Sequence, residues 1–258
     1  VLNLFFGPVV NAARGIAYQV SSALQGFVSN ISVAAKPQMV SSFAEGNAER
    51  TLKLMYSMSK LSFFILYIMA VPVCLEIDYI LHLWLGDVVP QHTANFVVLV
   101  ILTNFMNNLN APLSNVVYAT GKMKNYQVTF SVINILIIPV AYVALQMGLP
   151  PEAAFFSYFV MTVFVQIGCL YVLRTIIKIS LTDYFYRLCC PLLIFSVVAI
   201  PLPYIIKMSM SVGFYRLGCV TVMTCITAFV SFYCIVLNRK EKNIAVNGFN
   251  KIKSHVIK

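Results

Sequence analysis

The sequence contains little charge. Only 10% of its 258 residues are Asp, Glu, Lys or Arg, whereas soluble domains carry roughly a quarter. Apolar residues make up 60% of the chain, and the mean hydropathy is +0.85. This composition excludes an ordinary soluble domain and predicts an integral membrane protein.

The sequence also lacks the motifs of common catalytic and cofactor sites. Ala119-Thr120-Gly121-Lys122 resembles part of a phosphate-binding loop, but the glycine required five residues before Gly121 is replaced by Val116. His82, His92 and His255 are scattered, the seven cysteines form no Cys-x-x-Cys pair, and no Gly-x-Ser-x-Gly occurs. We therefore expect no cofactor, no metal and no enzymatic activity.

Apolar runs of spanning length recur along the chain, and each is near the ~20 residues that a bilayer requires. They lie at about 9–35, 61–81, 96–118, 128–147, 153–173, 188–206 and 212–237. The pattern predicts an all-α polytopic membrane helix bundle with about seven transmembrane helices. The last two, which carry little polar surface, are expected to be peripheral and mostly lipid-facing.

Lysine and arginine alternate between the connections. They gather at 36–60, 119–127, 174–187 and from 239 onward, and are sparse at 82–95, 148–152 and 207–216. The positive-inside rule places the basic set and the C-terminus in the cytoplasm. The net charge of +10 therefore indicates orientation, and we expect no nucleic-acid partner. The basic tail, residues 239–258, either lies on the anionic inner leaflet or is disordered.

The first helix would then enter from outside without a signal peptide. A helix entering in this way is expected to follow an earlier spanning segment. We therefore expect this chain to be the C-terminal part of a longer protein. The alternative is that Val1 marks a wrongly assigned start.

The first apolar run carries a polar stripe. Wound as a helix, it aligns polar residues at steps of three and four, namely Asn11, Arg14, Tyr18, Ser22, Gln25, Ser29, Ser32 and Lys36. The opposite face is apolar, with Val10, Ile16, Val20, Leu24, Phe27, Ile31 and Ala35. A membrane helix keeps such a stripe only where it lines a water-filled cavity or a partner helix.

Amide side chains on other helices add to this polar surface. Arginine suits phosphate because its planar fork donates two charge-assisted hydrogen bonds, and amides and tyrosine suit sugar hydroxyls. The predicted substrate path therefore comprises Asn11, Arg14, Tyr18, Gln25, Asn104, Asn107, Asn108 and Asn134. For any single Asn, a bond between neighbouring helices is the competing interpretation. Glu76 and Asp78 could couple a cation or proton, or could simply form a solvated helix end.

Several stretches resemble the Wzx-type polysaccharide flippases of the MATE-like superfamily. They are Phe5-Phe6-Gly7-Pro8 through Val20, Ala35-Lys36-Pro37-Gln38, Phe43 to Asn47, Ser59 to Phe64, Leu83-Trp84-Leu85-Gly86, and Thr120-Gly121-Lys122 before Tyr126-Gln127. The resemblance covers about the first 180 residues. It is strongest at 5–47 and weak in the last two helices.

The resemblance implies a domain organisation. Residues 1–6 would end a truncated preceding helix, 7–181 would form the C-terminal transporter lobe of five helices, and 182–238 would add two accessory transmembrane helices. The first lobe would be missing from this chain. The family's activity is flipping of undecaprenyl-diphosphate-linked oligosaccharide, for O-antigen or capsule, across the bacterial inner membrane by alternating access.

Three other readings remain open. A drug or cation antiporter of the same superfamily would be expected to place acids on the stripe that carries Arg14. A membrane glycosyl- or acyltransferase would require a catalytic base, and neither a carboxylate nor a histidine lies on the polar stripes. An isolated lobe could also be an inactive fragment, since half a transporter cannot build a two-sided site.

Overall fold

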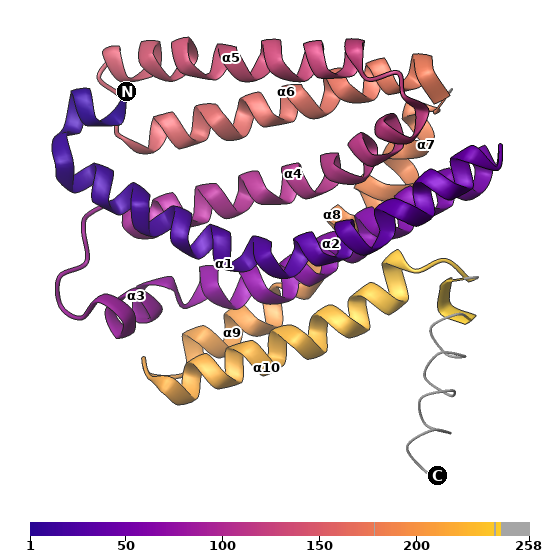
Figure 1. The fold of residues 1–258 in the computed structure, drawn as a ribbon. Helices are drawn as coiled ribbons and strands as arrows, with labels where there is room; N and C mark the ends of the chain where they lie inside the picture. Colours follow the sequence, from indigo (N-terminus) through magenta and orange to yellow (C-terminus); the bar gives the residue numbers. More distant parts are fainter. Residues whose placement is uncertain (178, 240, 244–258) are drawn as a thin grey trace.

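The computed structural model describes residues 1–177, 179–239 and 241–243, and every regular element in these residues is helical (Figure 1). The elements are α1 (Leu2–Ala44), α2 (Ala48–Leu75), α3 (Ile77–Leu85), α4 (Thr93–Thr120), α5 (Lys124–Gln146), α6 (Glu152–Ile177), α7 (Leu181–Tyr184), the π-helical turn η1 (Phe185–Cys189), α8 (Cys190–Ala199), α9 (Pro201–Ser209), α10 (Phe214–Ser231) and η2 (Phe232–Val236). The basic tail expected from residue 239 lies mostly outside the described residues.

Six helical runs within the described residues are long and apolar enough to cross a membrane. They are α2, α4, α5, α6, the run Leu181–Ser209 and the run Phe214–Val236. The chain is therefore an all-α polytopic membrane helix bundle, as its composition predicts. The seventh predicted span, at 9–35, lies within α1, where recurring polar residues lower the hydropathy.

The long helices pack side by side in an ordered series (Figure 1). α5 contacts α6, α6 contacts α4, and α4 contacts both α1 and α2. α10 packs against α2 and α9 on the other side of the bundle. Thus α1 packs against both α2 and α4, which also contact each other, and these two neighbours position its polar stripe.

α1 is interrupted near its beginning and is then continuous over a long distance. Gly7 has a φ of 75°, a left-handed conformation that glycine adopts without steric cost. Pro8 follows, where its fixed φ suits the first turn of the resumed helix. Pro37 does not end the helix, which continues to Ala44 and stops before Gly46.

The predicted span at 61–81 is divided differently in the structure. α2 begins at Ala48, where the Asn47 side chain accepts a hydrogen bond from the Arg50 backbone N–H at 3.0 Å. It ends at Leu75, three residues after Pro72, and α3 continues as a separate short helix. Glu76 lies at the joint between α2 and α3. The break that follows Pro72 therefore determines where this acidic side chain is placed in the bundle.

The last two spans are less peripheral than the sequence suggests. Phe195 of α8 and Phe232 of η2 are buried against aromatic side chains of α2, with ring centroids of Phe64 and Phe232 separated by 4.2 Å. The Tyr67 hydroxyl donates to the Ser196 carbonyl at 3.1 Å. Their outer faces expose large apolar side chains such as Leu193 and Phe229. These helices thus have one side packed on α2 and one side available to lipid.

Candidate functional site

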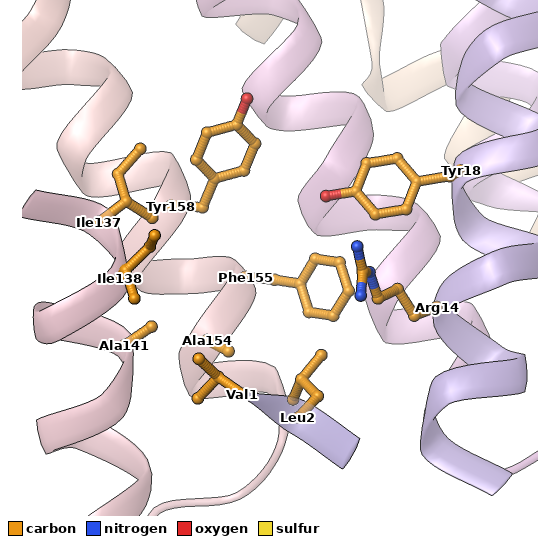
Figure 2. A pocket seen from close by; sticks show the side chains of 10 residues that line it. All are labelled: Val1, Leu2, Arg14, Tyr18, Ile137, Ile138, Ala141, Ala154, Phe155 and Tyr158. Carbon is orange, nitrogen blue, oxygen red and sulfur yellow. The ribbon is translucent and has the colours of Figure 1, made fainter. Parts of the chain in front are cut away.

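Arg14 lines a cavity of about 290 Å³ between α1, α5 and α6. Figure 2 shows Arg14 and Tyr18 projecting from α1 toward side chains of α5 and α6. Tyr158 and Phe155 enter from α6, and apolar side chains of α5 close the opposite wall. Among the residues that line this cavity, Arg14 is the one basic side chain, and none is acidic.

The Arg14 guanidinium stacks over an aromatic ring. Its Cζ lies 5.5 Å from the centroid of Tyr18, one helical turn further along α1. Both side chains remain exposed. The cation is therefore oriented by its own helix and still offers hydrogen-bond donors to the cavity, which suits a phosphate or another anion.

Two predicted path residues of α4 instead join helices. Asn104 Nδ2 donates to Ser21 Oγ of α1 at 2.8 Å. Asn108 Nδ2 lies 3.3 Å from Gln25 Oε1 and also donates to its own helix at the Asn104 carbonyl. The structure thus brings Gln25, Asn104 and Asn108 together as a contact between α1 and α4. Their amide groups are thus engaged in hydrogen bonds within and between these two helices.

The remaining predicted path residues lie apart from this contact. Asn11 is exposed on α1, and Asn107 is half-buried on α4. Asn134 Nδ2 donates to the Phe130 carbonyl of its own helix at 2.7 Å. The cavity wall from α5 is formed by Ile137, Ile138 and Ala141. The structure therefore groups Arg14 with Tyr18 and does not place Asn134 in the same cavity.

The sequence reasoning missed Tyr158, whose side chain faces the cavity from α6. It also missed Phe155, whose ring centroid lies 6.3 Å from that of Tyr18. Both residues sit in a helix that is apolar on most sides, so no amphipathic pattern marks them. The two residues are three apart in the sequence, so they lie on one face of the helix, and this spacing is the sequence signal that could have identified them.

The buried face of α1 contains several small residues. Ala13 and Ala17 are fully buried, and Ser21 is nearly so. These residues follow a small-xxx-small spacing, which allows two membrane helices to approach closely. Phe27, on the apolar face opposite the polar stripe, is exposed. Small side chains therefore set the α1 packing, because bulky ones would keep α4 at a distance.

The acidic pair does not form one site. Glu76 is buried and lies 2.6 Å from the Arg216 guanidinium of α10. Asp78 is exposed and lines a different pocket, near His82 and His92. Glu76 is therefore not a solvated helix end. Its nearest charge is a fixed arginine from an accessory helix.

No protein-family model, curated protein or solved structure matches this chain. Within the described residues, no group of three or more His, Cys, Asp or Glu side chains could hold a metal ion. The function therefore has to be argued from the geometry of the Arg14 cavity.

Proposed function

We propose that this chain is the C-terminal lobe of a lipid-linked oligosaccharide flippase. In this role it would move an undecaprenyl-diphosphate-linked oligosaccharide across the bacterial inner membrane by alternating access. Its two last spans would be accessory helices, and its C-terminus would lie in the cytoplasm. The resemblance at 5–47 and the membrane bundle both support this proposal.

The observation that carries the proposal is the exposed guanidinium of Arg14 in a cavity between membrane helices. An arginine within a membrane segment is costly unless water, an anion or a partner meets it. No acid lines the cavity, so an anionic group from the substrate is the natural counter-charge. The same absence of acids disfavours a cation antiporter.

The tyrosines give the cavity a second chemical character. The hydroxyls of Tyr18 and Tyr158 can each donate and accept a hydrogen bond, and Figure 2 shows both rings beside the space in front of Arg14. A substrate with a diphosphate next to a sugar would meet the cation and the hydroxyls together. The exposed part of the α1 stripe would face water or the opposite lobe.

The test compares Arg14→Lys with Arg14→Gln in the full reading frame that contains this chain. Lysine keeps the charge but loses the two-pronged fork, so we expect partial export. Glutamine should nearly abolish export without affecting membrane insertion. Surface polysaccharide is measured in a strain that lacks its own flippase. Arg50→Gln, which removes an exposed cation that does not line the cavity, serves as the matched control. Normal polymer from Arg14→Gln at normal protein level would refute the diphosphate role.

A further inference from the structure

A second cavity, of about 520 Å³, lies where α2 begins, between that helix, η1 and the segment after η2. We refer to it as the α2–η1 pocket. Four of its lining side chains are cationic, Lys53, Lys60, Arg187 and Arg239, and one, Glu241, is acidic. A cavity with this excess of positive charge favours an anionic ligand.

Two of the charged groups already satisfy each other. Lys60 Nζ lies 2.9 Å from Glu241 Oε2, and only 4% of the lysine side chain is exposed. Ser57 donates to the other Glu241 oxygen at 3.1 Å, and the Asn238 backbone N–H donates to Oε2 at 2.8 Å. Glu241 therefore anchors the C-terminal segment on α2, and it has little capacity left to neutralise the other cations.

The remaining cations are more accessible. Arg187 exposes 67% of its side chain and lies 3.5 Å from Asp183 in its own helical run. Lys53 lies 2.6 Å from Glu49, also at the surface. Exposed pairs of this type contribute little free energy. An incoming anion can therefore exchange with these acids at low cost.

The neighbours of Arg187 indicate the depth of the pocket in the membrane. Phe185 and Tyr186 precede it and are largely exposed, with their rings packed edge to face at 5.8 Å. Tyrosine, which carries a polar group on an apolar ring, is enriched at the interface between hydrocarbon and water. Arg187 thus lies at the level of lipid head groups, where basic pockets between membrane helices bind anionic lipids.

We propose that the α2–η1 pocket binds the phosphate group of an anionic phospholipid. Arg187 and Arg239 hold the phosphate oxygens by charge-assisted hydrogen bonds, and Lys53 adds positive charge at the rim. The site is independent of the Arg14 cavity, because no residue lines both. The lipid-site proposal therefore does not depend on the transport function, and the two can be tested separately.

The test is native mass spectrometry of the purified chain with phosphatidylglycerol and, in parallel, with phosphatidylcholine. We expect retention of phosphatidylglycerol and about 30-fold weaker binding in the Arg187→Gln, Arg239→Gln double variant, which corresponds to about 2 kcal/mol. The matched control is Lys122→Gln with Lys124→Gln. These two exposed cations lie at the same end of the bundle but not in the pocket, so binding should stay within twofold.

Three outcomes would overturn the proposal. The first is that the double variant binds phosphatidylglycerol as tightly as the wild type does. The second is that phosphatidylcholine binds the wild type as tightly as phosphatidylglycerol does. The third is that an equal concentration of inorganic phosphate displaces the lipid. The third outcome would identify a free phosphate as the ligand. If the double variant elutes as an aggregate, Lys53→Gln provides a surface substitution for which we expect about fivefold weaker binding.

Discussion

Arg216 on α10 donates two hydrogen bonds to one carboxylate oxygen of Glu76, from Nη2 at 2.6 Å and from Nε at 3.1 Å. The other oxygen, Glu76 Oε1, is buried without a hydrogen-bond partner among the described residues. This pair connects the joint between α2 and α3 to the last span. The carboxylate is thus held by one partner that lies 140 residues away in the sequence.

Arg216→Leu should destabilise the protein by about 3–5 kcal/mol, because it leaves the buried Glu76 charge unpaired. The measurement is the melting temperature in detergent. Arg50→Leu is the control, since Arg50 forms an exposed pair with Glu45 at 3.4 Å, for which the expected loss is within about 1 kcal/mol. Adding Glu76→Met to Arg216→Leu should recover most of the stability. Equal melting temperatures for Arg216→Leu and Arg50→Leu would contradict the role of the pair.

Ala17→Leu should separate α1 from α4. Ala17 is fully buried, so a larger side chain overpacks the contact and costs about 1–3 kcal/mol. Ala12→Leu adds the same volume at an exposed position of the same helix and should have little effect on the melting temperature. A similar response in both variants would show that small residues do not set this interface.

Attachment of the C-terminal segment should depend on pH through Glu241. Burial raises the pKa of this carboxyl. Hydrogen bonds from Lys60, the Asn238 N–H and the Ser57 hydroxyl, together with the Lys60 charge, lower the pKa by a larger amount, so it lies below its ordinary value. A lowered pKa contributes stability above the unfolded value of about 4.3, and this stability is lost as the pH falls through the folded value. We expect the segment to stay attached from pH 7 to about 5 and to detach in stronger acid.

Spin labels at the exposed positions 50 and 243, in a cysteine-free background, would measure this attachment as a distance. The distance should lengthen only at low pH in the wild-type sequence. Glu241→Gln removes the titrating group, so in this variant the distance between the two labels should be the same at pH 7 and at low pH. A pH response that persists in Glu241→Gln would assign the effect to another residue.

The orientation of the bundle can be tested at position 122, between α4 and α5. Lys122→Cys in a cysteine-free background should be protected from an impermeant maleimide in intact cells, because the basic connections are expected inside. Asp87→Cys, in the connection after α3, should react from outside. Labelling of position 122 in intact cells would reverse the proposed topology.

The sequence predicted the helical type and six of its seven spans correctly, because hydropathy over about 20 residues directly reflects the bilayer. Its errors were at the ends. α2 begins at Ala48, well before the predicted span at 61–81, because Lys53 and Lys60 interrupt the apolar run from which that span was predicted. Burial of Lys60 depends on Glu241, a partner from the other end of the chain that no local pattern indicates.

The Arg14 cavity was predicted in part. The stripe spacing placed Arg14 and Tyr18 together, because they lie four residues apart on one helix. The composition could not show that Asn104 meets Ser21 rather than the cavity, since that depends on how deeply α1 settles against α4. Ala13 and Ala17 control this depth, and alanine carries no polarity that a search for functional residues would detect.

The length of α1 has a mechanical consequence. The continuous part after the Gly7 kink, from Pro8 to Ala44, is about 55 Å long, which is nearly twice the ~30 Å hydrocarbon thickness of a bilayer. Arg14 lies near one end of this rod, and the Ser42 and Thr51 hydroxyls, 3.2 Å apart, fasten the other end to α2. Because that end is fastened, a tilt of α1 at the cavity would be passed on to the start of α2. α1 is thus a rigid connection between the Arg14 cavity and the start of α2.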